Sequence, residues 1–510
     1  MKIKINSIYS KSDIVAFFIL AGLIWIYLWL RAIFSPIIHD EAVTFYSYIQ
    51  TGRCIPPDIL LDANNHVLNS LLTICSYHLF GSSELALRLP NVLISILFFI
   101  YIFKIAGFIR SRINRWAFLI AMCFPHFIIE FFAYSRGYGM SIALVTASVY
   151  FLIKYVNGKQ ARNAFICLVY SALAVSANLS LISSFLLILF IILFVSLYSW
   201  KTLTTINLLK ISLSLLFIGI PALIILAKYS LLLKTKGLLY YGSNEGFFYV
   251  TIDSLSKVLF RSYHEVLNIL IVIIFFIGVI IVLITLVYKK YRKDLMLADF
   301  IFPFLLIGNI AATMVLALFL KVNYPEDRAA MYYYYYFAGA IFFISDFKII
   351  RNKHYRIILF LPFIMIVIQF FFLISLLFSS YTPEYRIPAK FYNYLIEESS
   401  EREFPPTVEA YKMHSAEWAY YNFRTGNRMN LLSFDNFPSA DAEYVIADDS
   451  SFPEWKKFYI PVLTDDISKL KLLKRIHDPE LKLIAKIDSI AIQEYCYDEY
   501  YNFIEINTDS

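Results

Sequence analysis

The chain has 510 residues, 59% of them apolar and only 16% charged, and its mean hydropathy is +0.64. Soluble domains carry about 25% charged residues, so this composition excludes a soluble globular protein and predicts an integral membrane protein. The charge is uneven: residues 1–380 contain 31 Lys and Arg against 15 Asp and Glu, whereas residues 381–510 contain 14 against 23. We expect no nucleic acid partner, because no basic run resembles a patch interleaved with aromatic residues.

Eleven apolar segments are candidates to cross a bilayer, which takes about 20 helical residues. The predicted spans are 13–34, 89–109, 115–132, 138–156, 163–179, 181–199, 207–229, 266–288, 297–320, 331–348 and 357–379. If the N-terminus is cytoplasmic, these spans place every dense Lys and Arg cluster on the inner side and most acids on the outer side, as the positive-inside rule requires. We therefore predict a multi-pass protein of the bacterial inner membrane.

Three segments are predicted to lie on the outer, periplasmic side. Two are the loops 35–88 and 230–265. The second loop mixes basic, aromatic and glycine residues. This composition fits a lid over a lipid substrate, and it equally fits a loosely ordered amphipathic loop. The third is the polar tail. The predicted fold is a polytopic α-helical membrane domain over 1–380, followed by a soluble α/β periplasmic domain over 381–510.

The tail shows its own local patterns. Residues 389–398 are predicted to be helical. Short apolar runs between turn-forming residues predict strands at 444–447, 481–485 and 489–493.

Asp40 and Glu41 follow the first span directly, in the sequence His39-Asp40-Glu41. Charged groups at a lipid–water boundary are costly, so an acidic pair there indicates a functional site. Partial desolvation would raise the pKa of Asp40 and suit it to act as a general base that takes a proton from an attacking hydroxyl, while Glu41 orients a partner group or a metal. The alternative is that these acids only begin an outer helix, with Asp40 as its N-cap.

Asn65 and His66 lie in the same outer loop and offer neutral donors and acceptors that suit sugar hydroxyls or phosphate oxygens. The alternative is a turn that leads into a helix. His39, His66 and a carboxylate could also bind a divalent metal, although no ligand spacing supports such a site.

Two arginines are candidates for binding phosphate. Arg136 precedes a span after a short outer turn, and a guanidinium group can bind a lipid phosphate through two N–H groups. Arg328 ends a short charged loop and could bind an anionic leaving group. The alternatives are snorkelling to ordinary headgroups and a charged interfacial turn. Glu84 and Arg88 are four residues apart, which favours a local ion pair on a short helix.

Several chemistries have no signature in the sequence. There is no Walker A loop, no GxGxxG after a strand and no zinc-binding helix motif, so we expect no nucleotide machinery. A lipid-linked, already activated donor would supply an outer site that has no access to nucleotides. The five cysteines show no metal spacing; Cys54 and Cys496 could pair in an oxidising compartment, but the sequence does not show that they are close.

These motifs resemble those of GT-C superfamily glycosyltransferases, most closely the bacterial relatives of protein O-mannosyltransferase and of lipid A aminoarabinose transferase. The resemblance covers roughly residues 13–380. It is carried by Asp40-Glu41, Asn65-His66-Val67-Leu68, the stretch from Phe80 to Pro90, Arg136-Gly137-Tyr138 and the loop from Tyr324 to Arg328. The chain departs from the family pattern at Val67, Leu68 and Gly137, where the family usually has proline.

The resemblance implies an inverting transferase whose donor is a sugar on polyprenyl phosphate and whose acceptor is a lipid, a glycan or a protein. It implies Asp40 as the base, Glu41 and His66 in the sugar or acceptor pocket, and Arg136 and Arg328 on the departing phosphate. The other candidate substrate-binding residues are Asn65, Glu84, Arg88 and Tyr138.

Two other classes stay open. A polyprenyl-dependent oligosaccharide polymerase or ligase would rely on arginine and histidine rather than on an acid in the first outer loop. A transporter would be expected to place charges in the middle of its spans and to consist of two related halves, and the sequence gives little sign of either.

Overall fold

The computed structural model describes residues 9–56, 59–239, 241–261, 265–287, 297–345, 353–400, 402–410, 414–429, 442–448 and 458–476. Contacts between residues divide the chain into two compact units. We call residues 1–29, 66–69 and 90–374 the helical unit, and residues 30–65, 70–89 and 375–510 the mixed unit. Helices α1, α3 and α4 contribute residues to both.

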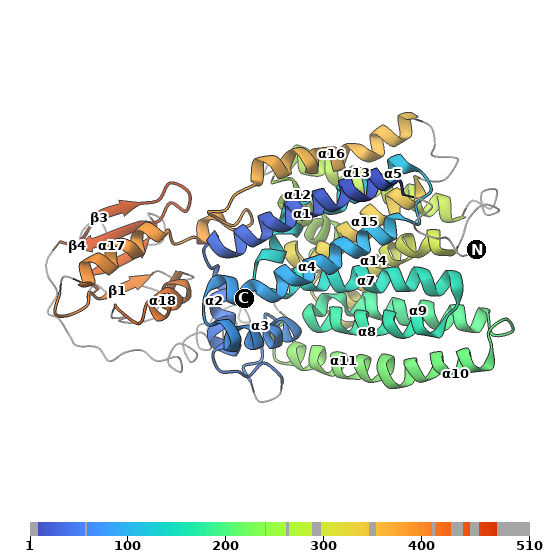
Figure 1. Cartoon of the computed structure of the whole chain (residues 1–510), viewed down its shortest axis with the longest axis horizontal. Helices are drawn as coiled ribbons and strands as arrows, with labels where there is room; N and C mark the ends of the chain where they lie inside the picture. The colour runs from blue at the N-terminus through green and yellow to red at the C-terminus, as the bar shows by residue number, and fades with distance from the viewer. Residues whose placement is uncertain are drawn as a thin grey trace. The chain divides into compact units, whose positions relative to one another are not determined.

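The described part of the helical unit is built from helices, the only open-ended structure whose backbone satisfies its own hydrogen bonds in lipid. The helices, labelled in Figure 1, are α1 (Lys11–Phe34), α4 (Glu84–Ala106), α5 (Arg112–Cys123), α6 (His126–Glu130), α7 (Gly137–Gly158), α8 (Ala161–Ala177), α9 (Ile182–Tyr198), α10 (Thr205–Ser214), α11 (Ile220–Thr235), α12 (Ser254–Phe260), α13 (Glu265–Val287), α14 (Ile301–Leu320), α15 (Met331–Ile344) and α16 (Lys353–Leu373). Helices α7 and α8 form the most extensive pair, and every residue of α15 is buried. These three helices therefore make up much of the interior.

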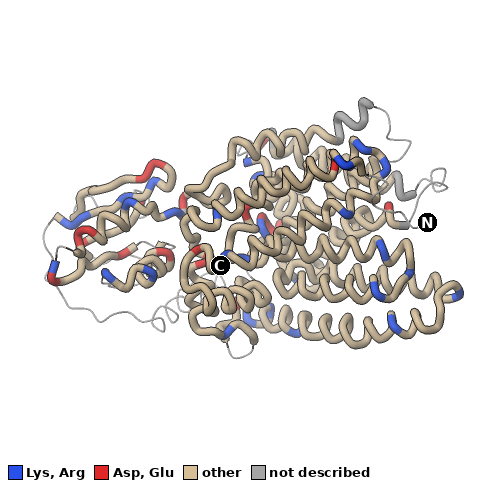
Figure 2. The backbone as a smooth tube through the Cα atoms, viewed as in Figure 1, with Lys and Arg blue, Asp and Glu red and all other residues tan. Residues whose placement is uncertain are grey.

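Each predicted span overlaps at least one helix among the described residues, which confirms a multi-pass helical membrane protein. Among the described residues, six helices are long and apolar enough to cross a bilayer alone, and α5 with α6 would form a seventh span, bent by 56°. Other predicted spans correspond to shorter helices, such as α8 with 17 residues and α15 with 14. The number eleven stays a prediction. In Figure 2 the long helices carry few charged residues along most of their length, as membrane spans require.

The mixed unit combines helices with a four-stranded sheet. Its helices are α2 (His39–Thr44), α3 (Val67–Phe80), α17 (Ala389–Ser400) and α18 (His414–Arg424), and its strands are β1 (Val408–Ala410), β2 (Tyr444–Ala447), β3 (Tyr459–Thr464) and β4 (Lys471–Arg475). The strand order is β1-β2-β4-β3, with β1 parallel to β2 and β4 antiparallel to both β2 and β3. The predicted helix at 389–398 and strand at 444–447 are confirmed as α17 and β2. The strands predicted at 481–485 and 489–493 lie outside the described residues.

One hydrophobic cluster of the mixed unit joins the loop after the first span to the tail. Phe45 and Tyr46, which follow α2, belong to the same buried cluster as Ala419 and Tyr420 of α18. The rings of Phe45 and Tyr420 meet edge to face, with their centres 5.2 Å apart. Buried aromatic pairs of this kind stabilise a fold through area and geometry together. The cluster therefore holds α2 and α18 in one packed body, although they are far apart in the sequence.

Candidate functional site

Glu41 and Arg88 form a buried ion pair inside the mixed unit. Arg88 Nε donates to Glu41 Oε1 at 2.9 Å, Nη2 donates to Oε2 at 2.6 Å, and both side chains are at most 1% exposed. The guanidinium group also donates to the carbonyl oxygens of Ser35 at 2.7 Å and Pro36 at 2.8 Å. A two-point contact between charged groups is strong and directional. It fixes the turn between α1 and α2, and with it the first turn of α2, which carries Asp40.

The ion pairs of Glu84 and Arg88 differ from the predicted local pair. Arg88 binds Glu41, whereas Glu84 binds Arg424 of α18. The four-residue spacing could not reveal this, because both partners come from distant parts of the chain. In the structure, the group that Glu41 orients is Arg88.

Replacing Arg88 by Met is expected to destabilise the protein by about 3–5 kcal/mol, because Glu41 would stay buried without its counter-charge. The measurement is unfolding of the purified protein, followed by loss of helical circular dichroism. Lys257→Met is the control, because the side chains of Lys257 and its partner Asp253 are 46% and 20% exposed, and pairs at the surface contribute about 0–1 kcal/mol. Equal stability of the two variants would contradict a structural role for the Glu41–Arg88 pair.

Asp40 is the accessible acid of this region. It lies in the first turn of α2 and is partly exposed, with one carboxylate oxygen buried. Its neighbours Glu41 and Glu417 are at most 1% exposed. The backbone N–H groups at a helix start favour negative charge nearby. Among these three carboxyl groups, Asp40 is therefore the one that a substrate could reach.

Asn65 is occupied by structural hydrogen bonds. Its Nδ2 donates to the carbonyl oxygen of Cys54 at 3.0 Å, and its Oδ1 accepts from Ser70 Oγ at 3.0 Å. The residue is 2% exposed. These contacts favour the interpretation of Asn65 as part of a turn that leads into α3. Cys496, which could pair with Cys54 in an oxidising compartment, lies outside the described residues.

His66 and Tyr138 lie together in the helical unit. The Nδ1 atom of His66 is 2.7 Å from the carbonyl oxygen of Ala177, at the end of α8, and the two rings meet edge to face with centres 4.6 Å apart. Because a carbonyl oxygen can only accept, Nδ1 carries the proton, and Nε2 of the neutral ring is then an acceptor. His66 is thereby oriented toward the start of α7, where Tyr138 lies.

Gly137 explains why the chain departs from the proline expected at this position. A Cβ atom added to Gly137 would lie 1.9 Å from the Ala177 carbonyl oxygen and 2.7 Å from the His66 side chain. Real Cβ atoms essentially never approach this closely, so only a hydrogen atom fits between α7, α8 and the imidazole. The glycine therefore allows the close packing that brings His66 to Tyr138.

Two guanidinium groups approach the ring of Tyr138. The Cζ atom of Arg136 is 5.8 Å from the ring centre and that of Arg328 is 5.9 Å from it. Arg136 is fully buried and Arg328 is partly exposed. Arg328 also lies 5.2 Å from the ring centre of Tyr241. Both distances to Tyr138 fall within the range of cation–π contact, so two positive groups converge on one aromatic side chain.

The loop that carries Arg328 is held by the predicted outer loop 230–265. The N–H of Tyr324 donates to the Ser243 carbonyl at 2.9 Å, and the N–H of Asp327 donates to Ser254 Oγ at 3.0 Å. Gly242 has a positive φ of 91°, and a Cβ there would lie 2.1 Å from the Tyr324 carbonyl oxygen. These contacts position Arg328; the role of the loop as a lid stays a prediction.

The structure thus places the predicted site residues in two groups. In the helical unit it brings together His66, Arg136, Tyr138 and Arg328. The mixed unit holds Asp40, Glu41, Asn65, Glu84 and Arg88. No three His, Cys, Asp or Glu side chains within the described ranges are arranged to hold a metal, and the divalent metal stays a prediction.

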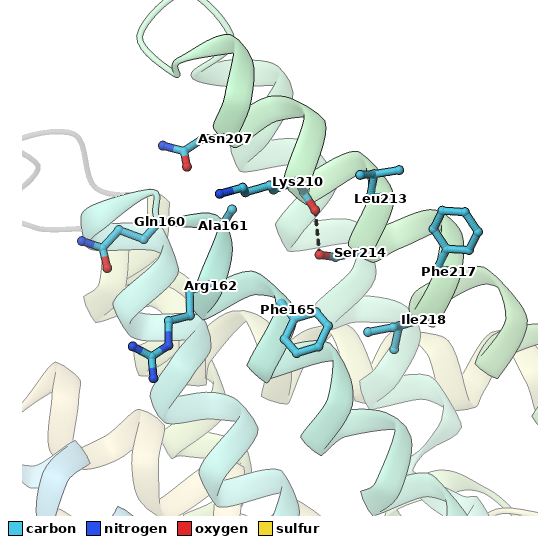
Figure 3. Close-up of a pocket in the computed structure, with 10 residues that line it drawn as sticks. All are labelled: Gln160, Ala161, Arg162, Phe165, Asn207, Lys210, Leu213, Ser214, Phe217 and Ile218. Atoms are coloured by element: carbon cyan, nitrogen blue, oxygen red, sulfur yellow. Dashed lines mark hydrogen bonds between the residues drawn. The ribbon is translucent and has the colours of Figure 1, made fainter.

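A separate cavity of about 570 Å³ lies between α8 and α10 (Figure 3). Arg162 and Lys210 line it, together with an apolar wall that includes Phe165 and Phe217. None of the predicted site residues lines this cavity. It combines positive charge with apolar surface away from the candidate site.

Solved structures that are similar to this chain include two of one protein. No family model matches the sequence, and no curated protein matches it. The chain is similar to ArnT from Cupriavidus metallidurans bound to undecaprenyl phosphate, with 9% identity and a TM-score of 0.38 over 91% of this chain and 98% of that chain. It is also similar to the apo state of the same protein, with 9% identity and a TM-score of 0.37 over 90% of this chain and 97% of that chain. ArnT is a lipid A aminoarabinose transferase, the group that the sequence resemblance names.

Proposed function

We propose that the protein is an inverting glycosyltransferase that moves a sugar from a polyprenyl-phosphate donor to a hydroxyl group of a lipid, glycan or protein at the outer face of the inner membrane. The observation that carries this proposal is the pair of guanidinium groups of Arg136 and Arg328 around Tyr138. Two guanidinium groups within 6 Å of the centre of one ring suit a phosphate bound nearby, whose oxygens can accept from both.

Asp40 supplies the complementary chemistry. In the proposed reaction its carboxylate takes the proton of the acceptor hydroxyl, and the acceptor oxygen bonds to the anomeric carbon on the face opposite the phosphate. The bond between that carbon and the phosphate oxygen breaks, and polyprenyl phosphate leaves with the bonding electrons. Arg136 and Arg328 stabilise the negative charge that grows on the leaving group. His66, which packs against the ring of Tyr138, helps to shape the pocket for the sugar or the acceptor.

A polyprenyl-dependent polymerase or ligase is the second candidate. The grouping of His66 with two arginines favours it, because this class relies on such residues rather than on an acid in the first loop. The two candidates differ in their need for Asp40. Only the transferase requires its carboxylate.

The experiment that tests the function compares surface glycolipids and glycoproteins, by mass spectrometry, in cells with and without the gene. A transferase predicts loss of one hexose, pentose or amino sugar from a defined acceptor. Loss of long glycan chains with no change in single-sugar modification would indicate the polymerase or ligase instead. Unchanged surface glycans would contradict both.

A further inference from the structure

Helix α18 of the tail packs directly on α2, the short helix that carries Asp40. Hydrogen bonds attach it to the segments on either side of α2. The N–H of Ile37 donates to Tyr421 Oη at 3.2 Å, and Tyr420 Oη donates to the Ser82 carbonyl at 2.6 Å. All these residues belong to the mixed unit. The tail is therefore part of the packing around the first outer loop.

Glu417 is the acid through which α18 reaches the start of α2. Its side chain is fully buried, and its carboxyl group accepts a hydrogen bond from the backbone N–H of His39. Its Oε2 lies 3.4 Å from Nδ1 of His414, one turn earlier on α18. Burial, with a contribution from the charges of Glu41 and Asp40, raises the pKa of Glu417 well above its usual range. The surroundings of Glu417 therefore favour its neutral form over its ionised form.

The start of α2 depends on contacts such as this one. The first N–H groups of a helix have no partner within the helix. Glu41 accepts from the N–H of Ile38 at 3.2 Å, and Glu417 accepts from the next one, that of His39. Helix α2 has only six residues, and so short a helix is not stable by itself. The direction of the Asp40 side chain therefore depends on groups outside the helix.

We propose that Glu417 is a positioning residue for Asp40: its hydrogen bond to His39 fixes the first turn of α2, so that a tail residue completes the site for proton transfer. This inference rests on the proposed function of Asp40. The titratable groups that interact with Glu417 are Asp40 and Glu41 on α2 and His414 and Tyr421 on α18. Glu41 is itself paired with Arg88. His414 does not add a charge at neutral pH, because burial lowers its pKa to about 4.

Two substitutions separate this role from simple packing. Glu417→Gln keeps an oxygen that can accept from His39, whereas Glu417→Leu has a similar volume and no acceptor. We expect the Gln variant to keep kcat within about threefold and the Leu variant to lose about 100-fold, with little change in the KM of the donor, since misplacing a catalytic group by about 1 Å costs that much. Glu443→Leu is the control: Glu443 is another buried acid of the tail, paired with Arg402. It should affect stability and leave kcat of the folded fraction unchanged.

Amide hydrogen exchange provides a readout that does not depend on activity. Exchange in residues 39–44 should be faster in Glu417→Leu than in the wild type and unchanged in Glu417→Gln. Equal exchange and equal kcat in all three proteins would overturn the proposal, as would a folded Gln variant that behaves like the Leu variant. If exchange follows the expected pattern while Asp40→Asn stays active, the contact is correct and the proposed function is wrong.

Stability should also depend on pH through Glu417. The folded-state pKa lies above the ordinary value of 4.5, so the folded protein binds this proton more tightly than the unfolded chain does. The resulting stabilisation is fully present below about pH 4.5 and is lost as the pH rises through the folded-state pKa. Glu417→Gln cannot ionise and should therefore gain Tm relative to the wild type as the pH increases. A Tm difference that is constant with pH would contradict a neutral Glu417.

Discussion

Replacing Asp40 by Asn is expected to lower kcat by about 10²–10⁴-fold, the usual contribution of a positioned general base. Asparagine has nearly the same shape, and Asp40 is partly exposed, so the variant should fold and insert normally. The assay follows release of polyprenyl phosphate from a polyprenyl-phosphate sugar by the purified full-length protein in lipid. The KM of the donor should change little, because the base acts on the acceptor.

The matched control for this variant is Glu397→Gln. Glu397 is an exposed carboxylate on α17 of the same unit, and the substitution removes the same charge. It should leave turnover at the wild-type level. Wild-type turnover in Asp40→Asn itself would show that another group accepts the proton, and would favour the polymerase or ligase.

Replacing either Arg136 or Arg328 by Gln is expected to lower kcat/KM by about 10²–10³-fold, the typical effect of removing one group that stabilises charge in a transition state. The phosphate gains negative charge as the sugar departs, and each guanidinium group offsets part of that charge. Lysine at either position should give an intermediate value, because it keeps the charge and loses the planar two-point contact. The assay is the same release of polyprenyl phosphate.

The double variant shows whether both arginines act on one phosphate. The guanidinium groups share Tyr138 as a neighbour, so their effects should be coupled rather than additive. Arg162→Gln is the control, because Arg162 lines the separate cavity of Figure 3. Full activity of both single variants, or a loss of equal size in Arg162→Gln, would contradict the phosphate assignment.

Much of the helical architecture follows from local properties of the sequence. Whether a segment is apolar enough to cross a membrane can be read from the residues of that segment alone. The predicted apolar segments therefore overlap helices of the structure. Turn-forming residues around a short apolar run were likewise sufficient to locate β2, and the helix predicted at 389–398 corresponds to α17. The count of membrane spans is less determined, because α8 and α15 are short and α5 and α6 are bent against each other.

The contacts of the candidate site depend on partners that local patterns do not specify. The spacing of Glu84 and Arg88 predicts a pair on one helix, yet each binds a residue from a distant segment, Arg424 and Glu41. Ion pairs follow the tertiary fold, and a buried arginine takes the carboxylate that the packing provides. Spacing alone therefore indicated a charged site without identifying its pairs.

Glu417 was missed because nothing near it in the sequence marks it. It lies in the tail, on an amphipathic helix whose other residues are typical of a soluble domain. The structure supplies what the sequence lacks: every residue from 415 to 420 is buried, Glu417 among them. An acid in such a position is costly unless it has a partner. Gly137 did carry a signal in the sequence, since it stands where the family pattern has proline, and a Cβ there would lie 1.9 Å from the Ala177 carbonyl oxygen.

The anomeric configuration of the product tests the central claim most directly. The measurement is an NMR determination of the anomeric linkage before and after transfer, with purified protein, a polyprenyl-phosphate sugar of defined configuration and the acceptor found by mass spectrometry. Attack by an oxygen that Asp40 has deprotonated, opposite a phosphate held by Arg136 and Arg328, predicts complete inversion together with release of one polyprenyl phosphate per sugar. Retention of configuration, or transfer without release of polyprenyl phosphate, would contradict this account.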